Sequence, residues 1–159
     1  MIVVADAGPL RYLILIEHAH VLPALYGQVL VPPAVITELT RERTPVVVRQ
    51  WIASKPEWLQ IRSPKGRLTA ARQTLGPGEL EAIALAEELS ADALLMDERD
   101  GRREAERRGL AVLGTLRVLA DAAEHDLAAL SRLTQTNFRA SEQLIQSLLE
   151  RDAARRRAP

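Results

Sequence analysis

Two aspartates directly follow short apolar segments of the chain. Asp6 follows residues 2–5, and Asp97 follows residues 93–96. Such segments predict buried strands of a parallel sheet, and parallel strands all end at the same edge, where open α/β folds bind ligands. We therefore expect the two carboxylates to lie close together. Taken alone, Asp6 is explained equally well as the N-cap of the helix that follows, because aspartate favours that position.

Two glutamates border apolar faces of predicted helices. Glu79 follows the chain breaker Gly76-Pro77-Gly78 and stands in the first turn of a helix predicted for 79–89. Compensation of the helix dipole explains many acids at this position, but not why Glu79 shares the apolar face of its helix. Glu38 lies three residues after Val35, also beside an apolar stripe. The sequence thus offers four carboxylates next to the expected core.

Four carboxylates brought together would repel one another, and their pKa values would rise unless a cation joined them. Oxygen ligands favour hard ions such as Mg²⁺ or Mn²⁺. The chain has no cysteine, and its histidines show no metal-type grouping; they are His18, His20 and His125. We expect His18 and His20 on the surface, on different sides of a helix. A hard divalent ion can activate water and neutralise a phosphoryl transition state, which favours phosphodiester hydrolysis.

Short apolar segments alternate with helical patterns along the chain. Strands are expected at 2–5, 28–31, 58–61, 93–96 and 110–113, with 58–61 at an edge. Helices are expected at 10–22, 34–43, 45–53 with Thr44 as its cap, 79–89, 101–108, 116–123, 127–133 and 139–154. This alternation predicts an α/β protein, a three-layer α/β/α fold with a short central parallel sheet. We expect one domain over 1–159, in which the helices at about 127–154 belong to the fold and 155–159 form a frayed tail.

The composition restricts the classes of protein. Apolar residues make up 47% of the 159 residues, which excludes a disordered chain, and the formal net charge is zero. A polyanion would therefore have to be held by a local patch of charge. No segment approaches the roughly 18 apolar residues of a membrane span, and no basic leader precedes Asp6. We expect no membrane association and a cytoplasmic protein.

Five segments, in chain order, resemble the motifs of the PIN-domain nucleases, in particular the branch that begins with a strand and then Asp-x-(Ser/Gly)-Pro-Leu. The segments are 3–10, 31–39, 75–86, 94–102 and 112–116. The resemblance covers about residues 2–123 and, weakly, the C-terminal helices. It implies a PIN-like fold and a metal-dependent endoribonuclease, often the toxin of a toxin–antitoxin pair. It also implies that four acids bind Mg²⁺ or Mn²⁺ and position water for RNA cleavage, namely Asp6, Glu38, Glu79 and Asp97.

The chain departs from this family pattern at Gly8, where many relatives carry serine or threonine. A hydroxyl that assists metal or phosphate binding in those relatives is absent here. Gly8 therefore keeps a second hypothesis open, in which the chain is a catalytically weak or inactive PIN-like module that binds RNA or a partner protein.

Several residues near the four acids have more than one possible role. Asp100 could be a ligand, a water holder or the N-cap of the basic helix, and we favour the cap. Thr115 could support the metal shell or cap its own helix. Arginines can bind phosphate in a bidentate manner, and three lie near the expected metal edge: Arg11, Arg99 and Arg102. Arg107 and Arg108 are better explained by a solvated helix face balanced by glutamates.

Other α/β phosphotransfer classes fit poorly. A receiver domain needs a lysine at a late strand end, whereas the only lysines, Lys55 and Lys65, are elsewhere. A dehalogenase-like phosphatase needs Asp-x-Asp, and position 8 is Gly8. Trp51 and Trp58 could belong to a dimer or partner surface or to the core. The family resemblance, but not the residues themselves, implies a homodimer and a small antitoxin.

Overall fold

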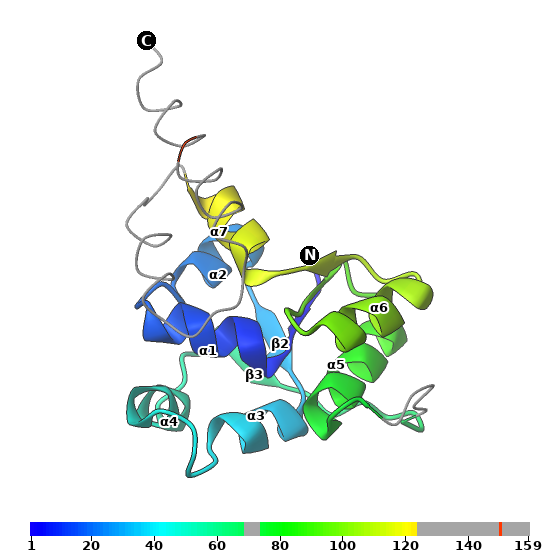
Figure 1. The fold of residues 1–159 in the computed structure, drawn as a ribbon, viewed down its shortest axis with the longest axis horizontal. Coiled ribbons are helices and arrows are strands. Elements are labelled where there is room, and N and C mark those ends of the chain that lie inside the picture. The colour runs from blue at the N-terminus through cyan, green and yellow to red at the C-terminus, as the bar shows by residue number, and fades with distance from the viewer. Residues whose placement is uncertain (69–73, 124–149, 151–159) are drawn as a thin grey trace.

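The computed structural model describes residues 1–68, 74–123 and 150. These residues form one parallel sheet with the strand order β3-β2-β1-β4-β5 and helices on both sides (Figure 1). The strands are β1 (Val3–Ala5), β2 (Val29–Val31), β3 (Leu59–Ile61), β4 (Ala93–Leu95) and β5 (Val112–Leu113). The helices are α1 (Ala7–Leu15), α2 (Val21–Tyr26), α3 (Pro33–Leu39), α4 (Val46–Ala53), α5 (Pro77–Glu88), α6 (Arg99–Arg107) and α7 (Thr115–Ala122).

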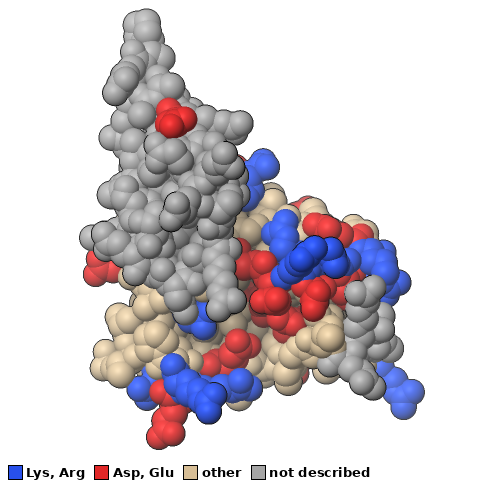
Figure 2. All heavy atoms as spheres, viewed as in Figure 1, with Lys and Arg blue, Asp and Glu red and all other residues tan. Residues whose placement is uncertain are grey.

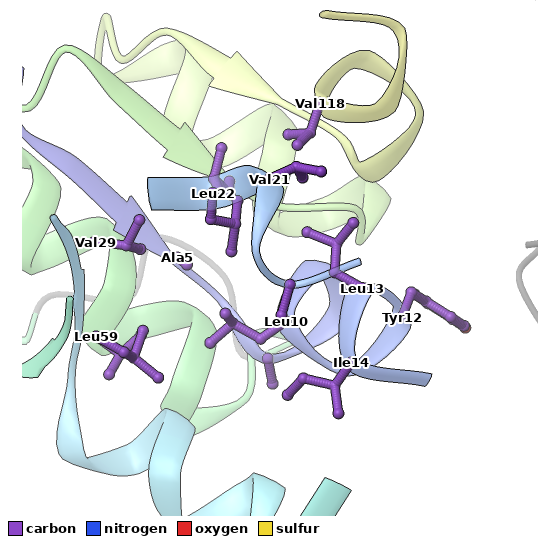
Figure 3. Packing of buried hydrophobic residues seen from close by; sticks show 14 of the residues in the cluster. Ala5, Leu10, Tyr12, Leu13, Ile14, Val21, Leu22, Val29, Leu59 and Val118 are labelled. Carbon is purple, nitrogen blue, oxygen red and sulfur yellow. The ribbon is translucent and has the colours of Figure 1, made fainter. Parts of the chain in front are cut away.

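The central strands are buried on both faces. Val3 and Ala5 belong to a larger core with residues of α1 to α4 and α7, whereas Val4 belongs to a smaller core with α5 and α6. Successive side chains of a strand point to opposite faces, which is why the three-residue run of β1 serves both cores. In the larger core, Leu10 and Leu22 point toward the strands that carry Ala5 and Val29 (Figure 3). The predicted α/β fold with its short parallel sheet is confirmed.

The helix predicted for 10–22 is two helices. α1 begins already at Ala7 and ends at Leu15, and Glu17 adopts a positive φ of 60° before α2 begins at Val21. Pro23 lies in the first turn of α2, where a backbone N–H has no partner inside the helix and its loss costs little. The apolar periodicity continues across the break because both helices pack on the same core, so the sequence pattern does not reveal the bend.

The bend between α1 and α2 buries a histidine that we expected at the surface. His18 is only 3% exposed, and its Nδ1 donates a hydrogen bond of 2.7 Å to the carbonyl oxygen of Ile16. His20 is exposed, as predicted, but neither histidine lies inside a helix. The prediction failed for His18 because it assumed a continuous helix.

Glu104 of α6 pairs with two arginines at the C-terminal end of this helix. Its carboxylate accepts hydrogen bonds from Arg107 (2.8 and 3.0 Å) and from Arg108 (2.7 Å). These hydrogen bonds lower the pKa of Glu104 to about 2. The side chains of Glu104 and Arg108 are only 5% and 13% exposed, so the prediction of a solvated helix face is wrong for these two residues. It fits Arg107, whose side chain is 62% exposed.

Trp51 and Trp58 are partly buried against the larger core, with ring centroids 5.8 Å apart. This position fits the core alternative. The predicted helices at 127–133 and 139–154 and the tail at 155–159 lie outside the described residues, apart from Glu150. Within the described part of the chain, no helix is long and apolar enough to cross a membrane.

Candidate active site

The order of the strands places a crevice beside β1. Within the sheet, β2 lies next to β1 on one side, and β4, which comes later in the chain, lies next to β1 on the other side. Such a switch in direction separates the loops at the carboxyl ends of the two strands, and open α/β folds bind ligands there. Asp6 directly follows β1, and Asp97 lies two residues after β4. The two aspartates therefore come from neighbouring strands at the switch point.

The two glutamates reach the same place from helices. α5 leads into β4 of the parallel sheet, and its first turn, which carries Glu79, lies at the carboxyl edge. Glu38 comes from the last turn of α3, which packs against α5. Glu81, a residue without a predicted role, ties the two helices together, because its Oε2 accepts a hydrogen bond of 2.8 Å from the N–H of Ala34.

All four acids line one cleft of about 820 Å³: Asp6, Glu38, Glu79 and Asp97. The structure thus brings together the carboxylates that the sequence scatters over 92 positions, from Asp6 to Asp97 counted inclusively. Figure 2 shows acidic side chains gathered between the region of α3 and that of α6, with basic side chains on both sides of them. Arg11 and Arg99 also line the cleft.

Asp6 is the most deeply buried of these acids. It is 5% exposed, and its Oδ1 is buried without a hydrogen-bond partner among the described residues. Burial, opposed by the N–H of Ala7 and reinforced by the neighbouring carboxylates, raises the pKa of Asp6 to about 7. Asp6 occupies the N-cap position of α1, yet within the described chain its side chain makes no capping hydrogen bond. The cap alternative therefore does not explain this side chain.

Asp97 is held by Thr115. The N–H of Thr115 donates to Oδ1 at 2.7 Å, and its hydroxyl donates to Oδ2 at 2.5 Å. Thr115 is completely buried and is the first residue of α7, whose N-cap is Gly114. Burial raises the pKa of Asp97, although both hydrogen bonds from Thr115 and the charges of Arg102 and Arg11 act to lower it. The N-cap of α7 is Gly114, so the capping interpretation of Thr115 is wrong, and its support of a metal shell stays a prediction.

Glu79 has two roles. Its Oε2 accepts a hydrogen bond of 3.1 Å from the N–H of Gly76 and so caps the start of α5. It also lines the cleft, and burial raises its pKa, with Glu98, Glu38 and Asp100 acting in the same direction. The helix-start explanation is therefore correct but incomplete for this residue.

Gly78 was not predicted to matter to the site. A Cβ atom at this position would lie 3.0 Å from Oε2 of Glu38 and 3.6 Å from Oδ1 of Asp6. The first contact is closer than ordinary van der Waals packing, so the missing side chain lets the start of α5 approach the two acids. The sequence marks residues 76–78 only as a chain break.

Two predicted helix caps need correction. The N-cap of α6 is Glu98, and Asp100 lies inside the first turn, so the N-cap prediction for Asp100 is wrong. The N-cap of α4 is Pro45, and the hydroxyl of Thr44 donates instead to the carbonyl oxygen of Glu38 at 2.9 Å. In both helices the N-cap is one or two residues from the predicted one, because several neighbouring residues are acceptable at a helix start.

Arg102 lies beside the cleft rather than in it. Its Nη1 donates a hydrogen bond of 2.9 Å to the carbonyl oxygen of Met96, the residue before Asp97. Its charge acts to lower the pKa of Asp97. The side chain therefore supports the segment that carries this acid.

The donors in the cleft fit a hard divalent ion. They are carboxylate oxygens, and the buried, unpartnered Oδ1 of Asp6 is a ligand atom available to a cation. Within the described residues, no three acidic, histidine or cysteine side chains are already grouped tightly enough to enclose an ion. Magnesium sites in proteins retain several waters and need only one or two carboxylates directly bound.

A family model described as a PIN domain (DUF3368) matches residues 2–153. Among solved structures, the chain is similar to a PilT N-terminus domain protein, SSO1118, from the archaeon Sulfolobus solfataricus P2. The two chains share 17% identity at a TM-score of 0.57, over 79% of this chain and 97% of that one, which shows a common fold. No protein with a curated description matches. Because the family model spans nearly the whole sequence, the chain belongs to the PIN-domain family.

Proposed function

We propose that the chain is a Mg²⁺- or Mn²⁺-dependent endoribonuclease. The family indicates a nuclease-type function, since PIN domains are in general nucleases that use divalent ions. The observation that carries the proposal is the buried Oδ1 of Asp6, which has no partner in the described structure and shares a cleft with three more acids. A carboxylate in this position is poorly satisfied by the protein alone and well suited to a cation.

In this proposal the aspartates and the glutamates have different tasks. Asp6 and Asp97 hold the ion, with Asp97 oriented by the two hydrogen bonds from Thr115. Glu38 and Glu79 complete the acidic wall, and Glu79, whose pKa is raised, is suited to accept a proton from water at its carboxylate. When bound, the ion would supply water activation and neutralisation of charge on the phosphate.

Metal binding and RNA cleavage measured on the same preparation test this function. We expect Mn²⁺ to bind in isothermal titration calorimetry, and we expect a fluorescent oligoribonucleotide to be cleaved with Mn²⁺ or Mg²⁺ but not with excess EDTA. A DNA oligonucleotide of the same sequence tests the preference for RNA. If millimolar Mn²⁺ does not bind, the nuclease proposal is wrong, and the alternative of a non-catalytic module that binds RNA or a partner is favoured.

The family resemblance also suggests that the chain is the toxin of a toxin–antitoxin pair and a homodimer. We propose these properties on that ground alone. Sedimentation of the purified protein tests the dimer. Arrest of growth on expression, relieved by a small protein encoded beside it, tests the toxin assignment.

Gly8→Ser is expected to preserve or increase cleavage by up to about tenfold, because the added hydroxyl could donate to Asp97 or to a bound phosphate. A Cβ at this position would lie 3.5 Å from Oδ2 of Asp97, an ordinary van der Waals distance, so the Cβ of serine fits. Initial cleavage rates in Mn²⁺ measure the effect. Gly8→Ala is the matched control, since it adds the Cβ without the hydroxyl. A loss of activity in both variants would show that the site tolerates no side chain at this position.

A further inference from the structure

Arg11 is a cation among the acids of the cleft. It lies on α1 one turn after Ala7 and Gly8, on the face that lines the cleft. Its charge acts to lower the pKa of Asp97, which places the guanidinium within electrostatic reach of that carboxylate. A positive charge here opposes the binding of a metal ion, so metal binding by itself gives no reason for an arginine in this position.

The hydrogen bonds of Arg11 are incomplete. Its Nη2 donates to the hydroxyl of Tyr12 at 3.3 Å, and the guanidinium carbon lies 5.0 Å from the centre of the Tyr12 ring. The Nε–H is buried and has no acceptor among the described residues. A buried donor without an acceptor is destabilising, so the described chain by itself does not fully satisfy this guanidinium.

We propose that Arg11 binds the non-bridging oxygens of the scissile phosphodiester through its guanidinium N–H groups. This proposal rests on the proposed function. The planar guanidinium presents paired N–H groups that match a phosphate, which a lysine ammonium does not do. The ring of Tyr12 supports the guanidinium from one side and so limits the directions in which it can donate. Arg11 is thus a catalytic residue that touches the substrate, beside the acids that hold the ion.

This role predicts opposite effects on metal binding and on cleavage. Arg11→Gln removes the positive charge, so Mn²⁺ is expected to bind roughly threefold to tenfold more tightly. The same substitution removes a charged donor to the phosphate, so kcat is expected to fall about 10²- to 10³-fold. Arg11→Lys keeps the charge, and we expect wild-type Mn²⁺ affinity with kcat still reduced about tenfold or more.

The experiment measures Mn²⁺ affinity by calorimetry, kcat and KM for an oligoribonucleotide, and the melting temperature for each variant. Arg99→Gln is the matched comparison, because Arg99 lines the same cleft but is exposed, and we expect mainly a salt-dependent rise in KM. Arg117→Gln controls for loss of a surface arginine, since Arg117 is 66% exposed and pairs with Asp121.

The outcomes separate the two proposals. Wild-type protein that neither binds Mn²⁺ nor cleaves RNA would overturn the proposed function and the role of Arg11 with it. Active wild-type protein with an unchanged kcat in Arg11→Gln would overturn the role of Arg11 alone. A variant that loses cleavage, Mn²⁺ binding and thermal stability together would show that Arg11 is structural, which also contradicts the proposal.

Discussion

Asp6→Asn and Asp97→Asn are each expected to lower metal-stimulated RNA cleavage by about 10³-fold. Each substitution removes one negative charge and one ligand oxygen from the cleft while keeping the shape of the side chain. A catalytic ion stabilises charge in the transition state by several kcal/mol, and about 4 kcal/mol corresponds to 10³-fold in rate. In Asp97→Asn the amide oxygen of the new side chain can accept from the N–H of Thr115, and its NH2 group can donate to the Thr115 hydroxyl oxygen, so the loop after β4 should keep its position.

Initial rates of oligoribonucleotide cleavage in Mn²⁺ test this prediction, with circular dichroism as the check on folding. Asp121→Asn is the control, because Asp121 lies on α7 in a surface pair with Arg117 and should leave the rate unchanged. The nuclease proposal fails if both cleft variants, fully folded, cleave RNA at the wild-type rate.

Asp6→Asn is also expected to make the metal-free protein more stable near neutral pH, by an amount on the order of 2 kcal/mol. The pKa of Asp6 is about 7 in the fold and 3.8 in the unfolded chain. Between these values the folded protein holds a proton that the unfolded chain has released, so raising the pH through this window favours unfolding. Above about pH 7 the loss of stability is complete, and well below pH 3.8 the carboxyl is protonated in both states and has no effect. The amide of asparagine must still be buried, which offsets part of the gain.

Urea unfolding in EDTA at pH 4 and pH 7.5 tests this stability change. We expect the free energy of unfolding of the variant to exceed that of the wild type at pH 7.5, and most of this difference to be lost at pH 4. Mn²⁺ should then stabilise the wild type at pH 7.5 more than the variant, because a ligand that binds only the folded state raises the free energy of unfolding. A variant less stable than the wild type at pH 7.5 would show that the carboxylate of Asp6 is already satisfied within the fold.

The positions of the strands and of the acids after them were predictable. Runs of four apolar residues are short, yet each ends at a change of residue type, as at Asp6 and Asp97. The rule that parallel strands share one carboxyl edge then places the acids without any knowledge of distances. The prediction for Glu79 depended on the direction of α5, which the parallel topology sets, since a helix between two parallel strands runs against them.

The wrong predictions are those that depend on contacts between distant segments, about which a local sequence pattern carries no information. The break between α1 and α2 was missed because both helices bury their apolar faces in the same core, which keeps the periodicity intact. The burial of His18 follows from that break. The cap of α6 was misplaced, because Glu98 and Asp100 are both acceptable helix-start residues and only the backbone distinguishes them.

The sequence by itself determined the class of fold and offered four acids as candidates for the site, because apolar periodicity, strand-end aspartates and glutamates beside apolar helix faces are local properties of the chain. Only the tertiary structure decided the burial, the hydrogen bonds and hence the pKa values of these acids. It buried Oδ1 of Asp6 without a partner in the described residues, placed Thr115 on Asp97 and let Gly78 bring α5 against Glu38. Burial and hydrogen bonding depend on which distant segments meet. That is a property of packing between elements, and no spacing within one element encodes it.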